Sequence, residues 1–126
     1  MKLVHISDIH LTSPGERMGG LDPHRRFALA LDEVRSKHQD ADRIIITGDL
    51  THWGEPDAYA ALKGALVHLP CPVRLLVGNH DVYYKTTNVC NYLSDNFREY
   101  EYVHIYDKQA KVQIEKYNFL MVPWVV

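Results

Sequence analysis

The sequence predicts an α/β domain built on a parallel sheet, because three apolar runs alternate with two amphipathic segments. The apolar runs, residues 3–6, 43–47 and 73–77, have the length and composition of buried strands. Helical patterns separate them, and the order strand-helix-strand-helix-strand indicates parallel strands joined by crossovers. Each run ends in polar side chains that can bind metals or move protons. Ligands of open α/β sheets bind at this carboxyl edge.

The first helical segment has a clear start. Asp22 followed by Pro23 is typical of an N-cap and a first helical residue. Four apolar residues then recur at helical spacing, namely Phe27, Ala30, Leu31 and Val34. We expect this helix to end near Gln39. The preceding residues 11–22 form a Gly-rich loop that directly follows Asp8 and His10, so we expect it to pass over their site.

A second helix is expected to begin at Pro56 and to be stopped by Pro70 and Pro72. Its apolar stripe consists of Tyr59, Leu62, Leu66 and Leu69. Beyond the third strand we expect a helix over 88–100 and short strands over 103–106, 112–115 and 119–124. Residues 121–126 are strongly apolar except for one proline. We therefore expect residues 1–126 to form a single domain that is cut off inside its fold.

Composition limits the class of protein. The 126 residues are 46% hydrophobic and 24% charged, with a formal net charge of −2, which gives no general attraction to polyanions. The amino terminus has no signal-peptide pattern, and no apolar run reaches the length of a membrane span. Cys71 and Cys90 match no zinc or redox spacing. We expect a cytoplasmic protein with reduced thiols and no membrane association.

Asp8 and His10 are the first candidate metal ligands. They lie two residues apart, so their side chains share one face of an extended strand. A carboxylate beside an imidazole suits a borderline divalent ion such as Mn, Fe or Zn. Asp49, after the next strand, is placed to bridge two ions, and Asn79 offers a carbonyl oxygen to the second. Two ions about 3.5–4 Å apart can share a hydroxide and bind the oxygens of an in-line displacement at phosphorus.

His80 and Asp81 are the candidate catalytic residues. His80 follows Asn79 directly and is not needed as a ligand, so it can stabilise or protonate the leaving oxygen. Asp81 is expected to hold the His80 ring and set its tautomer. Taken alone, an Asp-x-His pair or a Gly-Asp turn is ordinary surface structure. Three such motifs that each close a predicted parallel strand indicate one metal site.

These motifs carry a family resemblance. Asp8-x-His10, Gly48-Asp49 and Gly78-Asn79-His80-Asp81 resemble the first three signature motifs of the calcineurin-like metallophosphoesterases. The resemblance implies an α-β-β-α sandwich, of which this chain supplies the β-α-β-α-β half and the start of the second sheet. It also implies a dinuclear centre in which Asp8 and His10 bind the first metal, Asp49 bridges, Asn79 binds the second, and His80 is catalytic.

The later part of the family pattern is missing. The family adds an isolated histidine and then a Gly-His-x-His motif, whereas only His104 follows His80 here and no glycine follows Gly78. His104, in a Val-His-Ile-Tyr context, is interpreted as a strand-face histidine. The sequence therefore resembles the amino-terminal half of an enzyme or a relative that has lost part of its site. A homo-oligomer or a partner subunit that completes the site is a further expectation.

The branch of the family stays open, because the two halves differ. Gly48-Asp49-Leu50-Thr51 and Gly54-x-Pro56-x-x-Tyr59 resemble bacterial cyclic-nucleotide and glycerophosphodiester phosphodiesterases. His80-Asp81-Val82-Tyr83-Tyr84-Lys85 and the final Pro123-Trp124 resemble phage and bacterial DNA-repair nucleases of the SbcD type. His52 and Tyr83 are candidate substrate contacts, with ordinary packing as the alternative for both.

The leading hypothesis is a metal-dependent phosphoesterase that hydrolyses diesters with two divalent ions, Mn, Fe or Zn. Its substrate is a small nucleotide, a glycerophosphodiester or DNA. Residues 78–126 hold five Lys or Arg against six Asp or Glu, so no basic track favours DNA. The alternative from another class is a non-catalytic interaction module with a degenerate metal site. The clustered polar residues argue against that module, because a scaffold does not need them.

Overall fold

A computed structural model describes residues 1–81, 101, 103–106 and 109–121, except for the side chains of Asn79 and Tyr106. Four parallel strands form its main sheet, in the spatial order β1-β2-β3-β4. Their bounds are Leu3–Ser7 for β1, Arg43–Thr47 for β2, Val73–Leu76 for β3 and Val103–Tyr106 for β4. The first three strands pair in sequence order, as the alternating pattern predicts.

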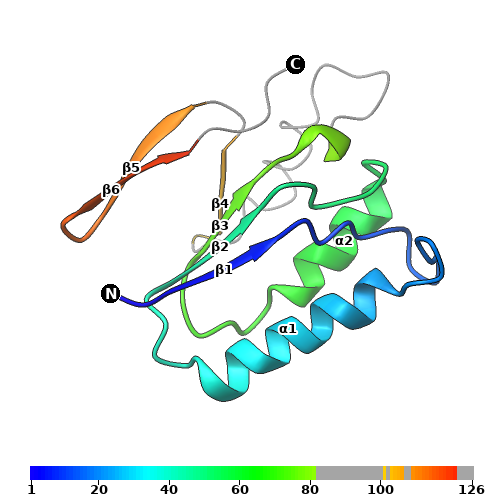
Figure 1. The fold of residues 1–126 in the computed structure, drawn as a ribbon, viewed down its shortest axis with the longest axis horizontal. Helices are drawn as coiled ribbons and strands as arrows, with labels where there is room; N and C mark the ends of the chain where they lie inside the picture. The colour runs from blue at the N-terminus through cyan, green and yellow to red at the C-terminus, as the bar shows by residue number, and fades with distance from the viewer. Residues whose placement is uncertain (82–100, 102, 107–108, 122–126) are drawn as a thin grey trace.

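Both long helices cover the same face of this sheet (Figure 1). Strand β2 is the middle of the core, because it lies between β1 and β3 and its three isoleucines are buried. The helices place their apolar faces against it, so one continuous cluster joins sheet and helices. The polar loops that follow the strands are thereby held at one edge of a rigid layer.

Helix α1 spans Pro23–Lys37 and begins as predicted. The Asp22 carboxylate accepts a hydrogen bond from the Arg25 N–H at 2.9 Å, which satisfies one of the unpaired donors of the first turn. Its buried face consists of Pro23, Phe27, Leu31 and Val34. The helix ends two residues before Gln39, at Lys37, with His38 as its C-cap.

Helix α2 spans Pro56–Ala65, so the prediction that Pro70 and Pro72 end it was wrong. The chain leaves the helix at Leu66 and takes a left-handed conformation at His68, with φ of 58°. Leu66 is fully buried although it lies beyond the last helical residue. Core packing thus continues past the end of the helix, which is why the apolar spacing predicted a longer one.

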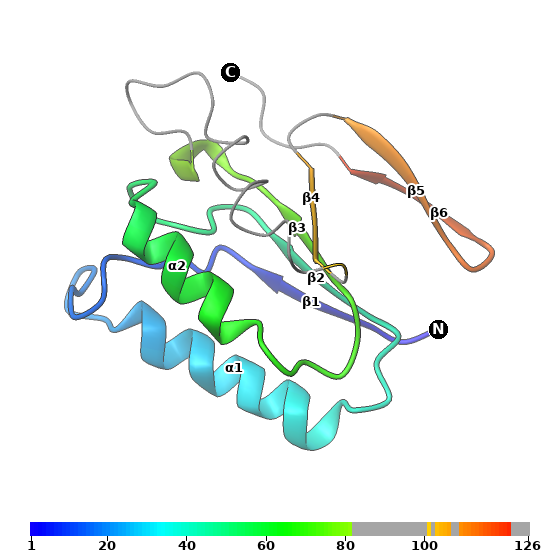
Figure 2. The ribbon, with the colours of Figure 1, turned by 180° about the vertical axis from the view of Figure 1, so that it is seen from behind.

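The second half of the described chain adds two features. Strand β4 extends the main sheet beside β3, with Val73 opposite Val103. Strands β5 (Ala110–Ile114) and β6 (Tyr117–Met121) form a separate antiparallel hairpin on the side of the sheet away from the helices (Figure 2). The predicted starts at residues 112 and 119 lie two residues after those of these strands, and residues 122–124 of the last predicted strand lie outside the described residues. The helix predicted over 88–100 lies outside the described residues.

Within the described ranges, no helix has both the length and the apolar character needed to cross a bilayer.

Replacing Asp22 by Ala should lower the free energy of unfolding by about 1 kcal/mol, because the N-cap hydrogen bond to Arg25 is lost. Asp32→Ala is the matched control, since this carboxylate lies on the same helix, 70% exposed, in an ion pair with Arg35. Urea denaturation of both variants gives the comparison. Equal effects of the two substitutions would contradict the capping role.

Candidate metal centre

The loops after β1, β2 and β3 meet at the carboxyl edge of the sheet. Pairing of the first two continues beyond the strands, because the His10 N–H donates to the Asp49 carbonyl at 2.9 Å and the His52 N–H donates to the Leu11 carbonyl at 2.8 Å. After β3 the chain turns into a short 3-10 helix, Asn79–Asp81. The three predicted motifs therefore lie side by side, as the strand order implies.

Asp8 and His10 do not continue an extended strand, so the predicted local geometry was wrong. Strand β1 ends at Ser7, and Asp8 and His10 both take left-handed backbone conformations, with φ of 52° and 46°. Non-glycine residues rarely adopt this region, and such residues gather at functional sites. The backbone of these residues keeps its hydrogen bonds to the loop after β2 but no longer has the extended conformation of a strand. Both side chains still reach Asp49.

Two glycines allow the carboxylates to approach the backbone closely. A Cβ atom at Gly48 would collide with the Asp8 carboxylate, and φ at this residue is 76°. A Cβ atom at Gly78 would collide with the Asp49 carboxylate and lie 2.7 Å from the Asp49 nitrogen. Glycine is required at both positions because only it leaves room for these side chains. Asp8 and Asp49 are thus each packed against the neighbouring strand end.

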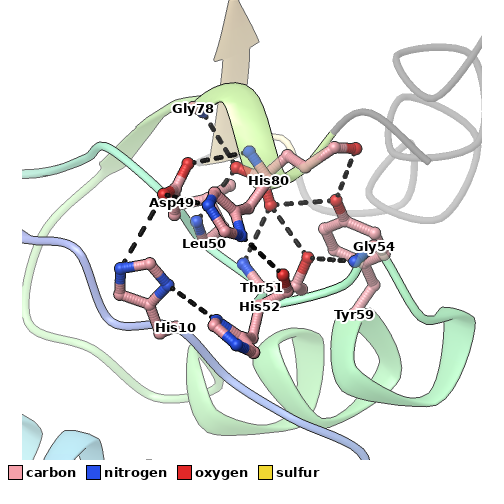
Figure 3. A network of polar contacts seen from close by, with 10 residues as sticks. His10, Asp49, Leu50, Thr51, His52, Gly54, Tyr59, Gly78 and His80 are labelled. Atoms are coloured by element: carbon pink, nitrogen blue, oxygen red, sulfur yellow. Dashed lines mark hydrogen bonds and ion pairs between the residues drawn. The ribbon is translucent and has the colours of Figure 1, made fainter. Parts of the chain in front are cut away.

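The Asp81 carboxylate ties the loops together, and Figure 3 labels the four residues that donate hydrogen bonds to it, Leu50, Thr51, Tyr59 and Gly78. Its Oδ2 accepts hydrogen bonds from the N–H groups of Leu50 and Gly78, both at 2.9 Å. Its Oδ1 accepts from the Thr51 N–H at 2.8 Å, the Thr51 hydroxyl at 3.0 Å and the Tyr59 hydroxyl at 2.9 Å. We call this group of five residues the Asp81 clamp. It joins the ends of β2 and β3 to helix α2.

The clamp corrects the role expected for Asp81. Its carboxylate, which is fully buried, is engaged by backbone and hydroxyl donors, whereas the His80 ring turns the other way and its Nδ1 donates to the His52 carbonyl at 2.8 Å. Burial raises the pKa of Asp81, and the N–H donors of Leu50, Gly78 and Thr51 oppose that shift. Those backbone donors favour the ionised carboxylate, because they cannot accept a proton.

Asp49 is the point on which the imidazoles converge. Its Oδ1 accepts the His80 backbone N–H at 3.0 Å. Its Oδ2 lies 3.7 Å from Nε2 of His10 and 3.9 Å from Nε2 of His80. Ligand atoms of Asp8, His10 and Asp49 all lie within 4.8 Å of one another. Two carboxylates and an imidazole at this spacing fit a borderline divalent ion such as Mn, Fe or Zn.

His52 lies beside the other two imidazoles, which also meet each other edge-on at a centroid distance of 5.6 Å. Its ring stacks on that of His80 at a centroid distance of 5.3 Å and meets His10 edge-on at 5.4 Å. The ring of Trp53, a residue that is 59% exposed, contacts the His52 ring at a centroid distance of 4.4 Å. Burial lowers the pKa of His52, and the neighbouring His10 and His80 lower it further. The sequence suggested only a substrate contact here, and it gave no signal of the packing between rings.

The other residues that the sequence analysis singled out lie at a distance from this cluster or outside the described part of the chain. The side chain of Asn79 and the whole of Tyr83 lie outside the described residues, so their predicted roles stay predictions. His104 lies on β4 opposite Arg74 and is exposed, as expected for a strand-face histidine. Tyr59 was predicted only as a core residue. A polar partner for its hydroxyl was foreseeable, because a buried tyrosine usually needs one, but the sequence did not identify that partner as Asp81.

A cavity of about 190 Å³ opens beside Asp8 and His10. Met18 and Leu21 line it from the loop over residues 11–22, and Phe27 lines it from helix α1. The loop therefore borders the site, in agreement with the expectation that it passes there. Besides Asp8 and His10, the polar residues of its lining are Ser7 and Arg26, and the remaining lining residues are apolar.

A family model described as calcineurin-like phosphoesterase matches residues 1–124. The chain belongs to the calcineurin-like phosphoesterase family. This membership agrees with the signature motifs, with the parallel α/β sheet and with the small second sheet. Divalent metal binding is a property of the family, and the convergent His and Asp side chains supply the kind of donors that it requires.

Curated relatives of this calcineurin-like phosphoesterase are named as phosphodiesterases. A probable cyclic nucleotide phosphodiesterase of Rhodopseudomonas palustris is 43% identical over 81 residues, which cover 64% of this chain and 30% of the relative. A cAMP/cGMP dual specificity phosphodiesterase of Mycobacterium tuberculosis is 36% identical, over 63% of this chain and 26% of the relative. A glycerophosphodiester phosphodiesterase of Enterobacter lignolyticus is 30% identical, over 64% and 30%. The chain thus matches about a third or less of these relatives.

Replacing Asp81 by Asn should lower the free energy of unfolding by about 2–4 kcal/mol, because an amide NH₂ would face buried N–H donors. Tyr59→Phe should cost about 1 kcal/mol, since it removes one of the five donors and leaves the ring packed. The control is Asp40→Asn, at an exposed carboxylate that pairs with Lys2. Chemical denaturation measures all three, and an Asp81→Asn effect as small as that of the control would contradict the clamp.

Proposed function

We propose that the protein hydrolyses phosphodiesters with the help of two divalent metal ions bound at the carboxyl edge of the sheet. The observation that carries the proposal is that the Nε2 atoms of His10 and His80 both lie near Oδ2 of Asp49. A carboxylate oxygen of Asp8 lies within 4.8 Å of the ligand atoms of His10 and Asp49. Clustered polar groups of this kind have no use in a folding scaffold.

The metal-binding roles follow the family pattern. Asp8 and His10 would hold the first ion, Asn79 would hold the second, and Asp49 would be a ligand of both. Bound divalent ions supply positive charge to the phosphate oxygens and make a water molecule more acidic. The glycines at 48 and 78 hold Asp8 and Asp49 in position, because larger residues would displace both carboxylates.

His80 protonates the leaving oxygen in this proposal. Its Nδ1–H is engaged by the His52 carbonyl at 2.8 Å, which leaves Nε2 on the side of Asp49 and the substrate. An imidazolium in this position keeps the Nδ1 proton and gives up the Nε2 proton, so the neutral ring that remains is already hydrogen-bonded. Asp81 acts on the site only indirectly, by fixing the loops that carry Asp49, His52 and His80.

The names of the relatives favour a small phosphodiester such as a cyclic nucleotide or a glycerophosphodiester. Trp53 beside the site offers an exposed ring for a base, with His52 and Tyr83 as further contacts. The family pattern includes histidine ligands that this sequence lacks after His80. We propose that a second subunit or additional chain supplies them.

Unaltered protein should take up Mn²⁺ and hydrolyse bis(p-nitrophenyl) phosphate, and Asp49→Ala should abolish both because the shared ligand is lost. His104→Ala, at an exposed histidine of β4, is the matched control and should change neither. Metal content by mass spectrometry and release of p-nitrophenol are the two readouts. Absence of metal and turnover in the unaltered protein would mean that these 126 residues alone are a fragment or a non-catalytic interaction module.

A cyclic nucleotide should be hydrolysed faster than linear DNA under Mn²⁺, since the sequence of residues 78–126 has no excess of basic over acidic side chains. The comparison uses 3′,5′-cyclic AMP and a linear duplex at equal phosphodiester concentration. Faster cleavage of the duplex would instead identify a nuclease of the SbcD type.

A further inference from the structure

His52 contacts both imidazoles of the site through different atoms. Its side-chain Nδ1 lies 3.3 Å from Nδ1 of His10, and its backbone carbonyl accepts the Nδ1–H of His80 at 2.8 Å. In each partner the contact engages Nδ1, and in each the opposite nitrogen, Nε2, faces Oδ2 of Asp49. His52 therefore contacts Nδ1 of both rings, the nitrogen that lies away from Asp49 (Figure 3).

The tautomer of His10 decides through which ring nitrogen it can bind a metal. A neutral imidazole carries one proton, and only the nitrogen without it can be a ligand. Binding through Nε2 therefore requires the proton on Nδ1, and that N–H needs an acceptor. The recorded partner of this atom is Nδ1 of His52. A ligand histidine whose second nitrogen donates to a fixed acceptor is oriented by it.

We propose that His52 is a positioning residue that sets the tautomers of His10 and His80, with its side chain acting on the first and its carbonyl on the second. The proposal rests on the proposed function, because it takes His10 as a metal ligand. His52 accepts the His10 Nδ1 proton and keeps its own proton on Nε2. His10 then presents an unprotonated Nε2 toward Asp49, and the neutral His80 ring that remains after it has given up its Nε2 proton keeps its other proton on Nδ1.

The surroundings of His52 hold its ring and backbone in place. His80 stacks on one side with an interplanar angle of 22°, and Trp53 packs edge-on at 65°. The His52 N–H donates to the Leu11 carbonyl at 2.8 Å. The preceding residue, Thr51, belongs to the Asp81 clamp. The acceptor is therefore fixed before metal arrives, which is the condition for orienting another side chain.

A competing arrangement uses the same atoms. Two imidazole nitrogens on one tetrahedral zinc lie about 3.3 Å apart when each Zn–N bond is about 2.0–2.1 Å. Ligand atoms of His10, His52 and His80 lie within 4.8 Å of one another. His52 would then be a ligand and His10 would bind through Nδ1. The two arrangements predict opposite tautomers for His10, so they can be separated.

The test compares His52→Ala and His52→Asn with the unaltered protein, and His104→Ala is the control. Zn²⁺ affinity is measured by calorimetry, and histidine ring nitrogens are observed by ¹⁵N NMR in the Zn²⁺-loaded protein. The unaltered protein should show His10 bound through Nε2, with a slowly exchanging Nδ1 proton. His52→Ala should weaken Zn²⁺ binding by about 10- to 100-fold and lose that proton signal. His104→Ala should change neither.

His52→Asn should rescue both readouts, because the Asn Oδ1 stands where the His Nδ1 accepts and cannot replace a zinc-binding imidazole. A His52→Ala variant with unchanged affinity and an unchanged proton signal overturns the positioning role. Loss of affinity in His52→Asn as large as in His52→Ala, or zinc on Nδ1 of His10, overturns it in favour of direct ligation. Failure of the unaltered protein to bind Zn²⁺ removes the proposed function itself, independently of the variants.

Discussion

The candidate site depends on one buried carboxylate. Asp81 accepts hydrogen bonds from the loop after β2, from the end of β3 and from helix α2. Taking an ion out of water is costly unless its lone pairs are satisfied, and five donors satisfy them here. The same bonds supply partners to backbone N–H groups that the strands leave unpaired where they end. A single side chain thus replaces the backbone hydrogen bonds between β2 and β3 at the point where these strands end.

Glycine makes the remaining approach possible. Without side chains at Gly48 and Gly78, Asp8 and Asp49 can lie against the neighbouring backbone. The segment that the Asp81 clamp holds also carries His52, whose ring contacts those of His10 and His80. The core between sheet and helices and the hydrogen bonds of Asp81 hold the site in place. Its side chains therefore need little rearrangement to bind an ion.

The sequence predicted the parallel order and the meeting of Asp49 with His10 and His80, because the strand ends of such a sheet share an edge. It could not predict the left-handed Asp8 and His10, since period-two reasoning assumes that the strand continues. The partners of Asp81 also escaped it, because they come from Thr51 and Tyr59, which are 30 and 22 residues away. The end of α2 was misplaced because buried Leu66 continues the apolar spacing after the helix has stopped.

The most direct test is anomalous diffraction at the manganese edge from crystals soaked in Mn²⁺. An ion in contact with Asp8, Asp49 and Nε2 of His10 is the predicted result. This result would establish that the side chains around Asp49 form a metal centre and that His10 binds the ion through Nε2. An ion held by the three imidazoles through Nδ1 of His10, or no ion at this edge of the sheet, would contradict the proposed ligand set.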